Sequence, residues 1–256
     1  MNRAPESVRV SYRRHASGNS LFRNDGNGHF QAMSSKAAVE MGRWAWSSDA
    51  WDFDHDGYAD LYVANGMISG PDQRELNSFF WRQVVSESPL EARPERSYEQ
   101  GWNAINELIR ADETWSGYER NVFYVNNRDG TFSDISATAG LDFPEDGRAF
   151  ALADIDHDGR LEVILKNRNS PQIRILHNEL LNLGHSVAFR LRGQKSNRDA
   201  IGACVTVEAG GMKQAKFLQA GSGFLSQHSK ELFFGLADNP GPVRASVRWP
   251  SDADTH

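Results

Sequence analysis

A nine-residue acidic pattern occurs twice in this chain, and each copy runs directly into an apolar segment of β-type residues. The copies span residues 52–60 and 154–162, and both alternate aspartates with other residues, carry glycine at the sixth position and end on a carboxylate. Four carboxylates in so short a segment repel one another by about 4 kcal/mol per close pair at an effective dielectric constant near 20. A loop of this kind is therefore expected to fold around a cation.

Oxygen ligands at alternate positions predict that the cation is Ca²⁺. Alternate side chains of a tight loop converge on one point, and a hard ion accepts six to eight oxygens. Gly57 and Gly159 allow the turn, because glycine adopts a positive φ without strain. The predicted ligands are Asp52, Asp54, Asp56, Asp60 and the carbonyl of Tyr58 in the first loop, and Asp154, Asp156, Asp158, Glu162 and the carbonyl of Arg160 in the second.

Neither loop matches an EF-hand beyond its ninth residue. An EF-hand needs a bidentate Glu at position twelve and a helix on each side, whereas Val63 and Leu165 occupy that position here, inside apolar runs. The pattern therefore predicts calcium loops flanked by strands. A pair of polar turns that are acidic by chance is the alternative, which the agreement between the two copies disfavours. His55 and His157 are expected to point into solvent rather than to bind metal.

A second repeated pattern has the same spacing as the acidic loops. Residues 21–30 match residues 123–132 at an offset of about 102, and a further match starts at 173–178, about 52 residues beyond the corresponding asparagine. The repeat is thus near 50 residues long, and the first copy contains an insertion of similar size. Repeats of this length with short strands and glycine-rich turns are typical of propeller blades.

The insertion, at about residues 67–118, is expected to be helical. Leu76, Phe79, Phe80 and Val84 fall on one face of a predicted helix, and a second amphipathic segment surrounds Trp102. These apolar faces are expected to pack onto the blades. The alternative is that Trp81, Trp102 and Trp115 line a binding surface, since long loops often carry function.

Composition excludes several classes of protein. A net charge of −6 over 256 residues argues against nucleic acid as the main partner. Cys204 is the single cysteine, so the chain has neither an internal disulfide nor a thiolate metal cluster, and its neighbours predict a buried strand thiol. No apolar run is long enough to span a membrane.

The last 70 or so residues change character and predict a small all-β domain. Its most distinctive segments are residues 196–203, residues 220–227 and the pair Trp249-Pro250. Ser222 stands between glycines, but Ala220 occupies the place of the first glycine in a nucleophile elbow, and the flanking segments are strand-like. A tight β-turn is therefore the expected role of Ser222.

These segments carry a resemblance to known families. Residues 1–182 resemble the FG-GAP or VCBS repeats of integrin-α-like β-propellers, and residues 183–256 resemble the ASPIC/UnbV domain of the cartilage acidic protein family. The resemblance implies an all-β fold: a partial β-propeller of about two blades and the start of a third, with the helical insertion, then a small β-sandwich-like domain truncated at its C-terminus. The remaining blades are expected outside this chain.

The resemblance also implies Ca²⁺ at the same carboxylates, with Glu162 replacing the usual final Asp. The expected function is a noncatalytic calcium-binding module that scaffolds binding of a protein or a carbohydrate in an exported protein, which is extracellular, periplasmic or at the cell surface. The alternative is an accessory domain of a secreted enzyme, or a divalent-metal-dependent enzyme acting on glycans or phosphoesters. Duplication of the loop favours the noncatalytic module, because a catalytic centre is needed only once.

Overall fold

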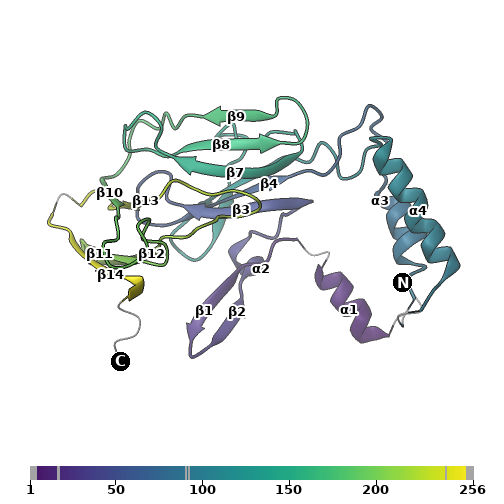
Figure 1. The fold of residues 1–256 in the computed structure, drawn as a ribbon, viewed down its shortest axis with the longest axis horizontal. Helices are drawn as coiled ribbons and strands as arrows, with labels where there is room; N and C mark the ends of the chain where they lie inside the picture. The colour runs from purple at the N-terminus through teal and green to yellow at the C-terminus, as the bar shows by residue number, and fades with distance from the viewer. Residues whose placement is uncertain (1–4, 16–17, 90, 92, 240, 252–256) are drawn as a thin grey trace.

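A computed structural model describes residues 5–15, 18–89, 91, 93–239 and 241–251. Most of the regular secondary structure in this part of the chain is β-strand, arranged in several antiparallel sheets (Figure 1). The sheets do not close into a barrel within the described residues. The predicted all-β fold with a partial propeller is thereby confirmed.

Two meandering sheets lie side by side and form the centre of the molecule. The first contains β3 (Ala45–Trp51), β4 (Asp60–Asn65), β5 (Val122–Asn126) and β6 (Phe132–Asp134), in that order; the second contains β7 (Gly147–Ala153), β8 (Glu162–Asn167) and β9 (Ile173–Leu176). Each is built like a blade. Their facing sides share one buried core formed by Trp51, Tyr62, Ala64, Phe123, Phe150, Leu152, Val163 and Leu165.

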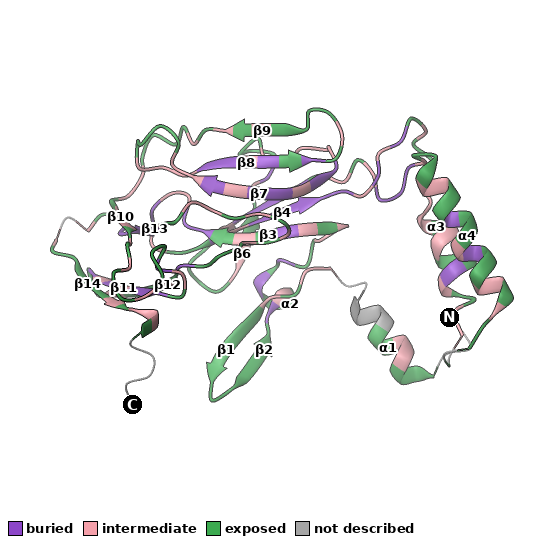
Figure 2. Ribbon diagram, viewed as in Figure 1, coloured by how far each residue is buried: buried purple, intermediate pink, exposed green. Residues whose placement is uncertain are grey.

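The N-terminal part precedes these sheets. It consists of α1 (Glu6–His15), a hairpin of β1 (Phe22–Gly26) and β2 (His29–Ala32), and the short helix α2 (Ser34–Ala37). Every residue of the hairpin is exposed, as Figure 2 shows, whereas Ala37 and Val39 pack against the first sheet.

The repeated sequence unit and the sheet are out of phase. The sequence pattern places the start of the second repeat unit at β5 and the start of a third unit at residues 173–178. In the structure β9 pairs with β8 along Val163↔Leu176 to Lys166↔Ile173, so it is the third strand of the second sheet, as β5 is of the first. The unit boundary expected from the sequence thus falls inside a sheet, because sequence similarity identifies equivalent strands but not their hydrogen-bonded neighbours.

The helical insertion lies between β4 and β5. It contains α3 (Asn77–Phe79), the π-helix η1 (Phe80–Val85) and α4 (Arg96–Arg110), which pack around buried Val84, Ile105 and Trp115. Trp102 joins this core, while Trp81 is 37 % exposed. Most of the tryptophans singled out from the sequence therefore serve the insertion's own core.

The C-terminal β unit consists of β10 (Ser186–Arg190), β11 (Cys204–Ala209), β12 (Met212–Phe217), β13 (Glu231–Gly235) and β14 (Arg244–Arg248). β10 pairs with β13, and β11 lies between β12 and β14, so two small sheets enclose a core that includes Val205, Val207 and Phe234. Cys204 is a free, buried thiol. The C-terminal β unit and the insertion lie at opposite ends of the two central sheets (Figure 1).

The helices of the described residues are short, and the longest, α4, has 15 residues. None of them combines the length and the apolar character required to cross one.

Candidate metal loops

The two acidic segments form equivalent hairpin connections, called here the first loop (residues 52–60, between β3 and β4) and the second loop (residues 154–162, between β7 and β8). The closing pairs are Trp51↔Asp60 and Ala153↔Glu162. Their backbones agree closely. His55 and His157 have φ of 63° and 62°, and the glycines two positions later have φ of 89° and 88°.

Backbone amides orient the same carboxylates in both loops. Asp52 accepts hydrogen bonds from the amides of Asp56 at 3.0 Å and Gly57 at 2.8 Å. Asp154 accepts the equivalent bonds from Asp158 at 3.1 Å and Gly159 at 3.0 Å. Each loop is therefore held by the side chain of its own first residue.

The final carboxylate of each loop reaches back to the loop's second residue. Asp60 accepts a hydrogen bond from the Phe53 amide at 3.2 Å, and Glu162 accepts one from the Ile155 amide at 2.8 Å. The longer Glu162 side chain thus makes the same contact as the shorter Asp60.

Three carboxylates converge in each loop. Oxygens of Asp52, Asp54 and Asp60 lie within 4.8 Å of one another in the first loop, as do oxygens of Asp154, Asp156 and Glu162 in the second. Such a cluster of oxygen ligands at the mouth of a hairpin fits a hard divalent cation. These are six of the eight side chains predicted as ligands.

The two remaining carboxylates pair with arginines. Asp56 accepts a hydrogen bond at 2.6 Å from Nε of Arg128, which follows β5, and Asp158 lies 3.1 Å from Nε of Arg160. The sequence pattern predicts both aspartates as metal ligands. It does not reveal that each of them forms an ion pair with an arginine.

His177 adds a nitrogen to the second loop, and the sequence reasoning missed it. Its Nδ1 lies 3.0 Å from Oε1 of Glu162 and 3.7 Å from Oδ2 of Asp156. The hydrogen bond with Glu162 raises the pKa of His177 above its usual value. His177 directly follows β9, and the antiparallel pairing of β9 with β8 places it beside the start of β8. Only a prediction of this strand pairing could have identified His177 as a neighbour of the loop.

The first loop is an unfavourable place for uncompensated negative charge. Burial raises the pKa of Asp52 to about 6, and the nearby charges of Asp56 and Asp54 contribute to the rise, whereas the hydrogen bond from the Gly57 amide opposes it. Burial also raises the pKa of Asp60 to about 7. Folding of this loop therefore favours protons or a cation at these two carboxylates.

The C-terminal β unit and the chain leading into it cover the first loop. The amide of Ala237 donates to the carbonyl of His55 at 2.8 Å, and the amide of Gly184 donates to the carbonyl of Asp54 at 3.1 Å. Nδ1 of His55 lies 3.3 Å from the carbonyl of Gly184.

The two histidines between ligands therefore differ in environment. The prediction that His55 points into solvent is wrong, because it is only 6 % exposed beneath these contacts. The same prediction is confirmed for His157, which is exposed.

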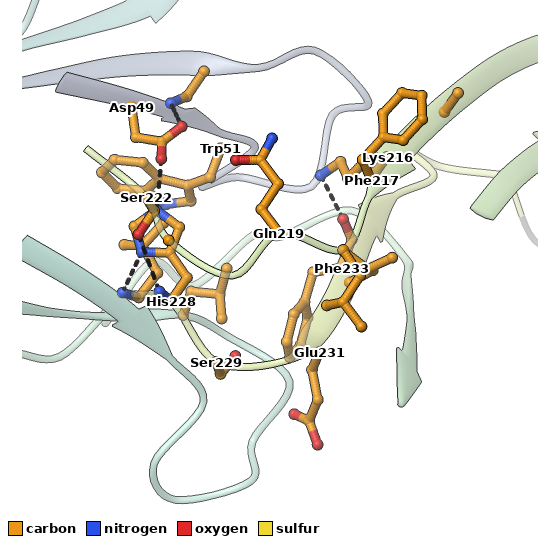
Figure 3. Close-up of a pocket in the computed structure, with 17 residues that line it drawn as sticks. Asp49, Trp51, Lys216, Phe217, Gln219, Ser222, His228, Ser229, Glu231 and Phe233 are labelled. Atoms are coloured by element: carbon orange, nitrogen blue, oxygen red, sulfur yellow. Dashed lines mark hydrogen bonds and ion pairs between the residues drawn. The ribbon is translucent and has the colours of Figure 1, made fainter. Parts of the chain in front are cut away.

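A cleft of about 330 Å³ separates the first sheet from the C-terminal β unit, and Figure 3 shows the side chains around it. His228 spans its wall: Nε2 lies 2.9 Å from Oδ2 of Asp49, and Nδ1 accepts the Leu152 amide at 3.1 Å. Both ring nitrogens of His228 are therefore engaged by groups other than the Ser222 hydroxyl. Ser222 accepts the His228 amide at 3.0 Å and bonds back to Ser226, as expected for a turn residue.

Comparisons with known proteins agree with this organisation. A family model described as FG-GAP-like repeat matches residues 8–63 and 106–165, and one described as ASPIC and UnbV matches residues 193–256. Both acidic loops fall within the repeat matches. Among curated proteins, cartilage acidic protein 1 of Homo sapiens is 44 % identical over 52 residues, which cover 20 % of this chain and 8 % of that protein.

The same protein of Xenopus tropicalis is 37 % identical over 71 residues, which cover 27 % of this chain and 10 % of the relative. The matched segment is thus a tenth or less of the length of either relative.

Proposed function

Because this chain combines FG-GAP-like repeats with an ASPIC and UnbV domain, we propose that it is a noncatalytic calcium-binding module of an exported protein. In this proposal Ca²⁺ stabilises the hairpin loops of the two central sheets. The rigid sheets then act as a scaffold that presents a surface to a protein or carbohydrate partner.

One observation carries the proposal: the same loop is built twice, with three converging carboxylates each time. Equivalent amide donors fix Asp52 and Asp154, which supports a shared structural role. A catalytic centre is needed once in a protein, whereas a cation that joins two strands is useful in every blade.

The cation would act through charge. Asp52, Asp54 and Asp60 would supply oxygens in the first loop, and Asp154, Asp156 and Glu162 in the second. Bound Ca²⁺ supplies the positive charge that lets these carboxylates remain ionised side by side. Binding to the folded form alone stabilises it by about 2.7 kcal/mol at a free calcium concentration one hundred times Kd.

Export is supported by two considerations. Extracellular calcium modules commonly bind in the range of about 10⁻⁴ to 10⁻³ M, which suits a calcium-rich compartment. The similarity to cartilage acidic protein 1 points in the same direction.

Calorimetric titration of the full chain with Ca²⁺ tests the proposal. We expect the titration to give two sites per chain. In a separate thermal unfolding experiment, Ca²⁺ should raise the midpoint by several degrees, and Mg²⁺ should raise it less because Mg²⁺ favours a tighter octahedral shell. The double variant Asp52→Asn with Asp154→Asn is expected to lose both responses. A wild-type chain whose midpoint is the same in Ca²⁺ and in chelator would refute the proposal.

A further inference from the structure

We propose that the C-terminal β unit is part of the first metal site, so that cation binding at the first loop and docking of this unit on the first sheet are coupled, whereas the second loop binds its cation independently. This inference rests on the calcium-binding function proposed above. It adds a role for the cation that the repeats alone do not require: holding the two parts of the chain together.

Close packing at β13 is the first observation. The end of β13 lies directly on the first loop: a methyl group added at Gly235 would overlap Oδ2 of Asp52 and the backbone of His55. Asp52 is one of the converging carboxylates. A residue larger than glycine at position 235 therefore cannot be accommodated without moving a predicted ligand.

Backbone hydrogen bonds are the second observation. The carbonyls of Asp54 and His55 accept bonds from the amides of Gly184 and Ala237. Gly184 precedes β10 and Ala237 follows β13, so the two lie at the same end of the sheet that these strands form. These two carbonyls belong to the central part of the first loop, between Asp52 and Asp56. The conformation of the loop is thus fixed partly from outside the repeat.

The glycine in the first loop supplies a third contact. A methyl group added at Gly57 would come within 2.9 Å of Sδ of Met212, at the start of β12, whereas one added at Gly159 would meet nothing within 4 Å. The second loop has the same backbone but an open surface at this point. The coupling is therefore specific to the first loop.

Reciprocity follows from thermodynamics. If docking orders the first loop and thereby favours the cation, the cation must favour docking by the same factor. Coupling between two sites is commonly worth a factor of about 5 to 150 in affinity. Loss of Ca²⁺ from the first loop would then loosen the contacts at Gly184, Gly235 and Ala237.

The matched histidines provide the test, since both have φ near 60° and only His55 contacts the C-terminal β unit. Glycine relieves the backbone equally at both positions, so a difference between the variants reports the contact. Calcium affinity is measured by calorimetry on the full chain, with the first loop isolated in an Asp154→Asn background and the second in an Asp52→Asn background. We expect His55→Gly to weaken the first loop about tenfold and His157→Gly to weaken the second less than about threefold.

Hydrogen exchange gives a second readout that a merely destabilising change would not reproduce. Ca²⁺ is expected to protect the amides of residues 184–186 and 233–237 in the Asp154→Asn chain but not in the Asp52→Asn chain. Gly235→Ala should abolish this protection. Gly221→Ala should retain it, because a methyl group there has only one contact, at 3.8 Å.

The outcomes separate the two ideas. If neither loop binds Ca²⁺, the proposed function fails, and the coupling fails with it. If both loops bind but His55→Gly and His157→Gly have equal effects, or if calcium protects residues 233–237 equally in both backgrounds, the coupling is wrong and the proposed function stands.

Discussion

The first and second loops have the same backbone and the same amide contacts, yet they occupy different environments. Asp52 and Asp56 are 8 % and 9 % exposed, whereas their equivalents in the second loop, Asp154 and Asp158, are half-buried and exposed. The first loop also pairs its third aspartate, Asp56, with Arg128 after β5, whereas the second loop pairs its third aspartate, Asp158, with its own Arg160. One local sequence pattern thus gives one local structure, while charge energetics depend on what the rest of the chain places around it.

The largest expected difference concerns calcium-dependent stability. Asp52→Asn should remove most of the stabilisation by Ca²⁺ at the first loop, about 2.7 kcal/mol at one hundred times Kd. The equivalent Asp154→Asn should cost less, because Asp156 and Asp158 of that loop are exposed and water screens their repulsion. Urea unfolding in Ca²⁺ and in chelator measures both. Equal losses would mean that burial does not distinguish the loops.

A pH titration in chelator should separate the loops next. The folded-state pKa values of Asp52 and Asp60, about 6 and about 7, lie above the usual value of 3.8. The folded chain therefore holds more protons than the unfolded chain between about pH 4 and 7, and its stability should fall as pH rises through that window, by several kcal/mol at about 1.4 kcal/mol per unit of pKa difference. Urea midpoints from pH 4 to 8 measure the slope.

The slope has a control within the chain. Asp60→Asn should flatten it, since this variant removes the carboxylate with the higher pKa. Asp154→Asn should keep it, since Asp52 and Asp60 are unchanged. If Asp60→Asn leaves the slope of stability against pH unchanged, then other groups determine the pH dependence of stability.

Substitution of the loop glycines gives a smaller effect. Gly57→Ala and Gly159→Ala each place an alanine at φ near +88°, at a common cost of about 1 kcal/mol. Gly57→Ala must in addition displace the flexible Met212 side chain, so it should be slightly more destabilising. Thermal unfolding in chelator compares the two. A larger loss for Gly159→Ala would contradict the packing of the first loop.

The smallest expected effect comes from the arginines. Arg128→Gln frees Asp56 from its ion pair and removes a positive charge near the first loop. Calcium affinity should rise about threefold, and stability in chelator should fall by less than 1 kcal/mol, roughly, since Arg128 is mostly exposed. Arg160→Gln should give a similar gain at the second loop. Calorimetric titration measures the calcium affinity of both variants. A lower affinity in Arg128→Gln than in the wild type would contradict this prediction.

Some of this molecule could be predicted from its sequence because the relevant interactions are local. The strand-flanked loops, the helical insertion and the turn role of Ser222 follow from residues close together in the chain. The burial of His55 could not be predicted in this way, since its partners Gly184 and Ala237 lie far along the sequence. His177 was missed for the same reason: its position beside Glu162 depends on the pairing of β8 with β9.

The phase of the repeat shows the same limit. Matching Asn126 with Asn178 identifies equivalent strand ends, but only the hydrogen-bonded register reveals which sheet each strand joins. Periodicity therefore indicates the kind and number of strands better than their grouping.

The position of the helical insertion has a consequence for the order of folding. Partners in β4 and β5, such as Val63 and Val122, are separated by roughly 60 residues, whereas Lys166 and Ile173 in β8 and β9 are separated by roughly 7. Loop-closure entropy then makes the β4–β5 pairing costlier by about 2 kcal/mol unless the insertion is already compact. We therefore expect the second sheet to nucleate early, and the first to wait until η1 and α4 have brought the ends of the insertion together.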